Sequence, residues 1–370
     1  MTIFFITVFT LYFLFLLSVI YGWNLMLNQK QQKISQRTFS ISVLVPFRNE
    51  EKRIPVLIES LKKLDYPYEK FEVIFIDDHS TDDSLKVVNK LIAGVVNFRV
   101  INSKTKGKKN AITEAINISS SEVIATSDAD CQVPHIWLDA INAQFQNPSV
   151  KLVAGAVRIE QTVSFFSRLQ AMEFSSLMGT AAATIALGFP SMCSGANLAY
   201  HRASFVEVGG FIGNTHIASG DDEFLMRKIE RRFGARSIQF LNHSNSIIAT
   251  TPLNSIKEFL TQRMRWAGKW QHNSSIVIKA LALFIVVFQV SYFSLLVASI
   301  LIPINYLLIT GITLKILLEG FFILRISKFL QQRFSTISFC MLQLIYPVYV
   351  ITIGILANLL RVSWKGRAIK

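Results

Sequence analysis

The stretch FEVIFIDDHSTDDSLKVVNKLI, residues 71–92, contains one complete unit of the predicted fold. It begins with a short apolar run, which predicts a buried strand. Two carboxylates, Asp77 and Asp78, follow the run directly, and the Ser and Asp residues after them favour the start of a helix. A strand that leads into a helix is the repeating unit of a parallel sheet.

The same alternation continues on both sides of this stretch. Strands are predicted at 41–47, 97–103 and 122–131, and helices at 54–64 and 106–119. We therefore expect a mostly parallel sheet with helices on both faces. Ligands of such sheets bind beyond the carboxyl ends of the strands. The polar segments that end the predicted strands, namely PFRNE, DDHS and DAD, should accordingly converge on one crevice.

Two regions of the chain are apolar enough for a membrane. Residues 3–21 carry no charge, and we predict an uncleaved transmembrane helix within 1–24, because a signal peptide would begin with basic residues. Residues 276–370 are predicted as a C-terminal membrane region with about three transmembrane helices. The expected C-terminal spans are 276–297, 299–324 after a turn at Pro303, and 338–360 with Pro347 inside it.

The sequence leaves two features of the membrane topology undecided. The stretch 314–334 mixes charged with apolar residues, so it is either the end of a span with a basic loop or a helix in the membrane interface. The tail 361–370 is basic and favours the cytoplasm, whereas three C-terminal spans would place it on the other side.

Residues 38–275 are predicted to form one cytoplasmic domain of an integral protein of a bacterial-type inner or plasma membrane. Lys30, Lys33 and Arg37 follow the first apolar run, and basic residues favour the cytoplasmic side. The net charge of +14 suits anionic lipids or substrates. No nucleic-acid partner is expected, because much of this charge flanks the apolar segments. The three cysteines are scattered and form no metal-ligand pattern.

Several short motifs could carry chemistry. Asp128 and Asp130 of DAD follow a predicted strand, and an extended segment would point both carboxylates at one Mg²⁺ or Mn²⁺ ion. A metal held there can stabilise a departing diphosphate. Each motif also has a structural interpretation: DAD as a surface loop, DDHS and SGDDEF as helix starts, KGKK as a solvated loop, and the basic cluster TQRMRWAGKW (261–270) as a lipid anchor.

The order of these motifs decides between the interpretations. DDHS, KGKK, DAD, GDDEF and QRMRW follow one another and precede an apolar segment. In this order the sequence resembles the membrane-embedded family-2 glycosyltransferases with the GT-A fold, which include cellulose, poly-N-acetylglucosamine and hyaluronan synthases and the ceramide glucosyltransferases. The resemblance covers about 41–275, and QRMRW matches the Gln-x-x-Arg-Trp signature.

The resemblance implies a role for each matching residue on the donor side. Pro46, Arg48 and Glu50 would lie in a loop against the nucleoside, and Asp78 would recognise the base, usually uracil. Lys108 of KGKKNA would contact the diphosphate. Asp128 and Asp130 would form the metal-binding Asp-x-Asp motif.

On the acceptor side, Asp222 would be the general base, and CSGANLAYHR (193–202) resembles the acceptor loop. Gln262, Arg265 and Trp266 would form what we call the closing motif, and Arg263 is adjacent to them. Arg265 would assist the diphosphate, and Trp266 would stack on the acceptor sugar or wall its site.

The implied activity is that of an inverting hexosyltransferase, which moves a sugar from a nucleotide-sugar donor, expected to be a UDP-sugar, to a lipid or glycan acceptor at the membrane. A processive synthase that exports its polymer remains the alternative. A nucleotidyl or phosphoryl transferase is disfavoured, because no Walker-type loop is evident. A non-catalytic nucleotide-sugar-binding scaffold would be expected to lack Asp222 or one Asp of the Asp-x-Asp motif. No feature of the sequence indicates whether the protein has a partner subunit.

Overall fold

The computed structural model of the chain describes residues 2–29, 37–215, 217, 219–269, 275–301, 306–359, 362–364 and 367–369. These residues form two compact units. We call Leu25–Glu160 with Thr184–Thr251 the sheet unit, and Met1–Asn24, Gln161–Ala183 and Pro252–Lys370 the helical unit. Neither unit is continuous in the sequence, and each is described by itself.

The sheet unit is built on a seven-stranded sheet. Its strands are, in spatial order, β3 (Phe98–Asn102), β2 (Phe71–Asp77), β1 (Ile41–Phe47), β4 (Val123–Thr126), β8 (Leu198–His201), β6 (Leu152–Ala154) and β9 (Ile238–Phe240). Among the described strands of this sheet, only β8 runs against its neighbours, so the sheet is mostly parallel, as predicted. A smaller sheet pairs β5 (Cys131–Gln132), β10 (Ile248–Thr250) and β7 (Val157–Ile159).

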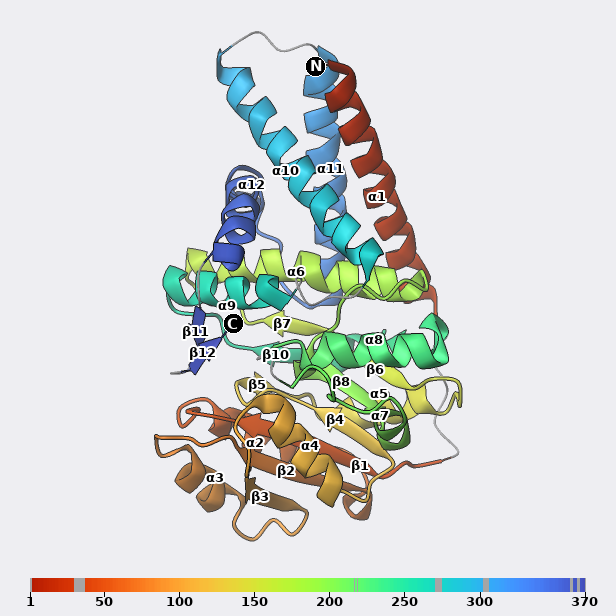
Figure 1. The fold of residues 1–370 in the computed structure, drawn as a ribbon, viewed down its shortest axis with the longest axis vertical. Helices are drawn as coiled ribbons and strands as arrows, with labels where there is room; N and C mark the ends of the chain where they lie inside the picture. The colour runs from red at the N-terminus through yellow and green to blue at the C-terminus, as the bar shows by residue number, and fades with distance from the viewer. Residues whose placement is uncertain are drawn as a thin grey trace. The chain divides into compact units, whose positions relative to one another are not determined.

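Helices alternate with these strands (Figure 1). They are α2 (Ile54–Leu61), α3 (Ser84–Ile92), α4 (Lys108–Ile118), α5 (Trp137–Phe145), α7 (Arg202–Glu207) and α8 (Asp221–Phe233). Helix α4 packs against β1 and β2, and α3 packs against β3. Both central strands, β1 and β2, are buried almost throughout, as expected for strands covered by helices.

One strand prediction needs correction. The expected strand over 122–131 ends at Thr126, and the backbone then turns. The N–H of Cys131 donates to the carbonyl of Asp128 at 3.2 Å, which closes a tight turn over Ala129. Asp128 and Asp130 therefore lie on a turn, and the expected alternation of side chains along an extended segment does not apply to them.

The helical unit contains four helices that are long and apolar enough to cross a membrane, by length and composition. These candidate spans are Ile3–Asn28, Ile276–Ser299, Tyr306–Phe329 and Thr336–Ala357. They belong to α1 (Thr2–Asn28), α10 (Ile276–Leu301), α11 (Tyr306–Phe329) and α12 (Thr336–Leu359). Residues 314–329 continue α11 without a break, and Pro347 lies inside α12. Lys30, Lys33 and Pro303 lie outside the described residues.

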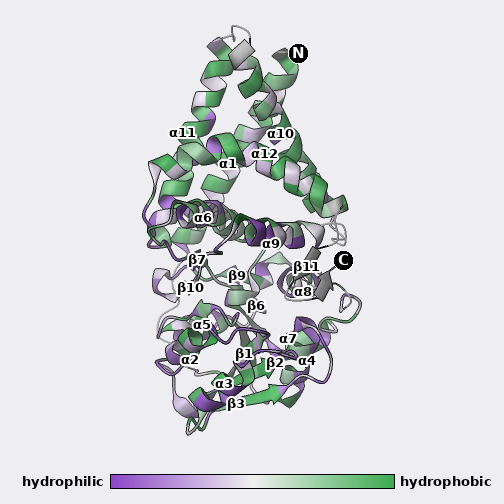
Figure 2. Cartoon of the chain, turned by 90° about the vertical axis from the view of Figure 1, so that its left-hand side faces the viewer, coloured by the Kyte–Doolittle hydropathy of each residue, from purple (hydrophilic) through white to green (hydrophobic). Residues whose placement is uncertain are grey.

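Two further helices of this unit, α6 (Phe165–Ala186) and α9 (Ile256–Gly268), lie crosswise to the long helices and below them in Figure 1. Figure 2 shows the four long helices as mostly hydrophobic, whereas α9 carries several hydrophilic residues. Helix α9 packs against α12. A short antiparallel pair follows, made of β11 (Val362–Trp364) and β12 (Arg367–Ile369).

A polar network lies among the candidate spans. Glu319 of α11 accepts hydrogen bonds from Tyr12 of α1 at 2.5 Å and from Gln343 of α12 at 2.9 Å. Lys315 lies 3.2 Å from Glu319 and 4.0 Å from the ring centroid of Tyr292 in α10. Charges inside a membrane are costly unless they are paired within the protein. This network supplies that pairing and connects all four helices.

Candidate active site

The ends of β1 and β2 are tied together by Arg48. Its guanidinium Nη1 donates to the backbone carbonyls of Asp78 at 3.1 Å and His79 at 2.9 Å. His79 has a φ of 61° and Asn49 a φ of 53°, a region that residues other than glycine rarely enter. Backbone strain of this kind often accompanies functional sites. Arg48 therefore joins the first two strand-end loops.

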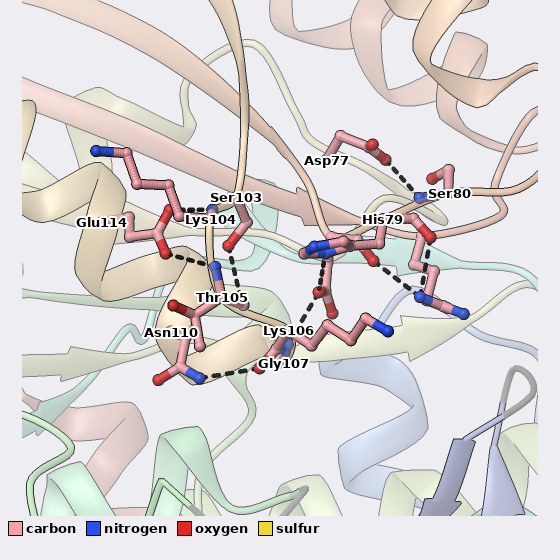
Figure 3. Close-up of polar contacts among 12 residues, drawn as sticks. Asp77, His79, Ser80, Ser103, Lys104, Thr105, Lys106, Gly107, Asn110 and Glu114 are labelled. Carbon is pink, nitrogen blue, oxygen red and sulfur yellow. Dashed lines mark hydrogen bonds and ion pairs between the residues drawn. The ribbon is translucent and has the colours of Figure 1, made fainter.

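Asp78 connects these loops to the start of α4. Figure 3 shows this region, with His79 and Ser80 near Lys106 and Gly107. The side chain of Asp78 is buried, and Oδ1 accepts a hydrogen bond from the N–H of Gly107 at 2.9 Å. Gly107 has a φ of 112°, which a side chain would disfavour. Asp78 thus fixes the turn that leads into Lys108, rather than standing as an isolated carboxylate in the loop.

Lys108 is the centre of the charge cluster. Its Nζ lies 2.8 Å from Asp128 Oδ1 and 2.9 Å from Asp221 Oδ2. Burial disfavours the charged ammonium, but the two carboxylates outweigh it and raise the pKa of Lys108 above its usual range. Burial would likewise raise the pKa of Asp221, but the ammonium of Lys108 lowers it. Lys108, Asp128 and Asp221 thus form an ion triad.

Asp222 lies beside the triad, on the first turn of α8. Its Oδ2 accepts from the N–H of Gly195 at 3.1 Å, and its Oδ1 accepts from the N–H of Glu223 at 2.7 Å. Gly195 belongs to the predicted acceptor loop, and its carbonyl accepts from Thr126 Oγ1 at 2.7 Å. The end of β4, this loop and the start of α8 are thereby joined.

Gly195 also packs tightly on the triad. A Cβ at this position would lie 2.9 Å from Asp221 Oδ2 and 3.3 Å from Lys108 Nζ. Glycine lets the loop backbone approach the charged groups this closely.

The donor set of the Asp-x-Asp turn suits a hard divalent cation. Among the described residues, no group of three or more His, Cys, Asp or Glu could together hold a metal ion. Two carboxylates nevertheless fit Mg²⁺ or Mn²⁺, which keep bound waters and use substrate phosphates as further ligands. Cys131 follows the turn, but burial and the nearby Asp130 and Asp128 raise the pKa of its thiol well above the usual value. It therefore stays a thiol, a poor metal ligand.

Of the residues predicted for the first loop, Pro46 lies in a strand, whereas Glu50 lies in the loop between β1 and α2. Pro46 is part of β1, where it pairs with Ile76, beyond the last residue that pairs with β4. Glu50 is buried: its backbone N–H donates to Ser84 Oγ at 2.7 Å, and its carboxylate lies 3.7 Å from Arg53. The nucleoside contacts assigned to them stay predictions.

The closing motif lies on α9 in the helical unit. Gln262, Arg265 and Trp266 are half-buried and share one face of the helix by their spacing. Arg263 is buried, and its guanidinium binds the carboxylate of Glu173 in α6, with Nε 3.1 Å from Oε1 and Nη2 2.6 Å from Oε2. Burial disfavours the charge of Arg263, but Glu173 outweighs it and raises its pKa. The predicted substrate contact of Arg263 stays a prediction, since its guanidinium is engaged within the protein.

The structure adds functional candidates that the sequence did not single out. Asp221 binds Lys108, and in the sequence only its position next to Asp222 indicates a role. Gly195 lies in the predicted acceptor loop, but the resemblance does not single out this residue. Glu173 lies in the long helix α6, and no motif marks it.

A solved mannosyltransferase from Pyrobaculum calidifontis, determined with GDP-Man and Mn²⁺, has a similar fold. The TM-score is 0.59 at 16% identity, and the match covers 92% of this chain and 94% of that one. The sheet unit accordingly has a GT-A-like fold, as predicted from the sequence.

The sequence match to a protein family covers less than half of the chain. Residues 42–209 match glycosyl transferase family 2, so the chain carries a domain of that family, in agreement with the resemblance seen in its motifs. The matched segment includes Asp78, Lys108 and both residues of the Asp-x-Asp turn, whereas Asp222 and the closing motif lie beyond it.

Two kinds of relative are similar over part of their length. A β-monoglucosyldiacylglycerol synthase from Nostoc sp. is 31% identical over 39% of this chain and 32% of the relative. A poly-β-1,6-N-acetyl-D-glucosamine synthase from Staphylococcus epidermidis is 25% identical over 54% of this chain and 48% of the relative. The chain thus spans about a third to a half of the length of these relatives.

Proposed function

We propose that the protein is a metal-dependent, inverting glycosyltransferase that moves a sugar from a nucleoside-diphosphate donor to a lipid acceptor at the cytoplasmic face of a membrane. The observation that carries the proposal is the joining of Asp221 and Asp222, at the start of α8, to Lys108 and the Asp-x-Asp turn of the family 2 domain. These groups match the needs of a displacement in which a hydroxyl loses a proton while a diphosphate departs.

Asp222 is the proposed general base. Its carboxylate is oriented by the N–H groups of Gly195 and Glu223, so it is held in place before an acceptor arrives. It accepts the proton of the acceptor hydroxyl as that oxygen attacks the anomeric carbon and the bond to the diphosphate breaks. A positioned base of this kind contributes about 10²- to 10⁴-fold to the rate.

Asp128 and Asp130 are the proposed ligands of Mg²⁺ or Mn²⁺. The bound ion would neutralise charge on the departing diphosphate. In the structure Asp128 is bound by Lys108, so the ammonium must exchange partners when the metal site fills. Lys108 would then turn to the phosphate oxygens, and Asp221 would keep it within the site.

The donor end is assigned to the loops joined by Arg48 and Asp78. Asp78 would recognise the base, with Arg48, Pro46 and Glu50 bordering the nucleoside. Arg265 would assist the diphosphate, and Trp266 would wall the acceptor site beside Gln262. We favour a UDP-sugar donor and treat GDP-mannose as the first competitor, because the structural neighbour was solved with GDP-Man.

A lipid acceptor is favoured over a growing polymer. The glucosyldiacylglycerol synthase is named for a lipid acceptor, and four candidate spans provide an anchor close to lipid. The poly-N-acetylglucosamine synthase supports the alternative, a processive synthase. No nucleic-acid partner is proposed.

The test is nucleotide release from the full-length protein reconstituted in lipid vesicles. UDP- and GDP-sugars are offered one at a time with Mn²⁺ or Mg²⁺, with diacylglycerol present or omitted. We expect release from one donor, dependent on both metal and lipid, and lost in Asp222→Asn. Release without the lipid, together with a high-molecular-weight product, would favour the processive synthase. Binding of a donor without turnover under every condition would favour a non-catalytic scaffold.

A further inference from the structure

The buried ion pair between Arg263 and Glu173 has no part in the mechanism above. Both side chains are only 4% exposed, and the guanidinium meets the carboxylate through two nitrogen atoms. Tyr349 of α12 donates a hydrogen bond to Glu173 Oε1 at 3.3 Å. The pair therefore connects three helices of the helical unit: α6, α9 and α12.

Arg263 also contacts two members of the closing motif. Its Nη1 donates to the side-chain oxygen of Gln262. Its guanidinium lies over the ring of Trp266 at 4.3 Å from the centroid and over Phe259 at 4.5 Å. A guanidinium stacked on an aromatic ring restrains that ring, because the attraction depends on its orientation. The contacts of Arg263 thus restrain both side chains.

The surroundings make this arrangement rigid. Phe174, next to Glu173 in α6, packs against Trp266 at 6.0 Å between centroids, and Phe259 packs against Tyr349 at 5.7 Å. An ion pair removed from water is strong only with good geometry and further hydrogen bonds, and both are present here. The side chains of the pair cannot move without exposing a charge to an apolar environment.

We propose that Glu173 and Tyr349 are positioning residues that act through Arg263 to hold Gln262 and Trp266 in the geometry needed to receive the acceptor. The role of Trp266 toward the acceptor rests on the proposed function, whereas its restraint by Arg263 does not. Tyr349 contributes to this restraint from α12, which is a candidate membrane span.

The test compares Glu173→Gln with Glu319→Gln in the reconstituted full-length protein. Glu319→Gln is a matched control, because it removes the same charge from another poorly exposed ion pair of the same unit. The first readout is acrylamide quenching of Trp266, taken as the difference between each variant and the same variant with Trp266→Phe. We expect more quenching in Glu173→Gln and no change in Glu319→Gln. This readout needs no enzymatic activity.

The second readout is steady-state kinetics with the donor and lipid that support turnover. We expect kcat/KM for the acceptor to fall on the order of 10²-fold in Glu173→Gln, since small displacements of a positioning group have effects of that size. The KM for the donor should change less than kcat/KM for the acceptor, because most of the proposed donor contacts, those of Asp78, Lys108 and Asp128, lie in the sheet unit. Tyr349→Phe should change the same quantities by less, and Glu173→Asp should restore part of the loss.

Equal quenching of Trp266 in wild type and Glu173→Gln would overturn the proposal, and so would an equal change in Glu319→Gln. If Glu173→Gln does not fold, Tyr349→Phe and Glu173→Asp carry the same test. If the wild type transfers no sugar, the proposed function fails while the quenching result still decides whether Glu173 restrains Trp266.

Discussion

Two cations in this protein are each bound by carboxylates, and their surroundings differ. Lys108 is 31% exposed, and its partners Asp128 and Asp221 are 41% and 14% exposed. Arg263 and Glu173 are both 4% exposed. The first arrangement stands in a partly solvated site with a glycine packed on it, whereas the second is enclosed by aromatic rings.

The difference indicates how each pair can act. Water and incoming ligands can replace the partners of Lys108, because the exposed groups lose little solvation on exchange. Arg263 cannot exchange its partner without leaving a charge buried and unpaired. The same chemistry thus provides an exchangeable contact in the sheet unit and a fixed one in the helical unit.

Replacing Lys108 should have the largest effect on turnover. Lys108→Met removes the cation that we propose for the departing diphosphate, and loss of one such group typically costs about 10²- to 10³-fold in kcat. Lys108→Arg keeps the charge and should retain part of the activity. Steady-state kinetics with saturating metal measures both. An unchanged kcat in Lys108→Met would show that Lys108 takes no part in the reaction.

Loss of the Arg263–Glu173 pair should destabilise the fold more than loss of the Lys108–Asp128 pair. Glu173→Ala leaves Arg263 buried without a partner and should lower the free energy of unfolding by about 3–5 kcal/mol. Asp128→Ala removes a partly exposed carboxylate and should lower it by about 1 kcal/mol or less. Denaturant unfolding in detergent compares the two variants. Equal losses of unfolding free energy in the two variants would show that burial does not determine how much each ion pair stabilises the fold.

Gly195→Ala tests the close approach of the acceptor loop to the triad. The added Cβ would lie 2.9 Å from Asp221 Oδ2, so the carboxylate or the loop must shift. We expect a loss of about 1–3 kcal/mol in stability, as for other overpacked sites, together with lower kcat. Gly354→Ala is the control, because a Cβ there would meet nothing within 4 Å. Wild-type kinetics in Gly195→Ala would mean that the loop adapts without disturbing the triad.

The smallest effect is expected at the surface. Arg232 and Glu207 form an ion pair with side chains 63% and 43% exposed. Glu207→Ala should change the free energy of unfolding by less than about 1 kcal/mol and leave kcat unchanged. A larger loss would show that exposure is a poor guide to the strength of ion pairs in this chain.

The sheet could be predicted because its strands are short apolar runs bounded by polar loops. The strand at 41–47 was predicted with the boundaries that the structure has, since Ile41–Phe47 is buried on both faces. The end of the fourth strand could not be read, because Ala129 and Cys131 are apolar enough to extend the pattern although the backbone turns. Local pattern does not distinguish a buried turn from a buried strand.

The candidate site was partly predictable for a related reason. Lys108, Asp128 and Asp222 stand at strand ends or helix starts, where the topology of a parallel sheet brings them together. Glu173 could not be found, because an acidic residue within a long helix has no local mark and its partner is 90 residues away. The interactions of Arg263 depend on that distant contact, so adjacency in QRMRW suggested a different role for it.

The most direct test of the account is transfer of labelled sugar to lipid in proteoliposomes, with the donor identified by nucleotide release. Wild type, Asp222→Asn and Asp130→Asn are compared with Mn²⁺ present or chelated, and the labelled lipid is extracted and analysed by mass spectrometry. The account predicts one glycolipid product with inverted anomeric configuration, formed only by wild type with metal. A product that Asp222→Asn forms at the wild-type rate, or one with retained configuration, would contradict it.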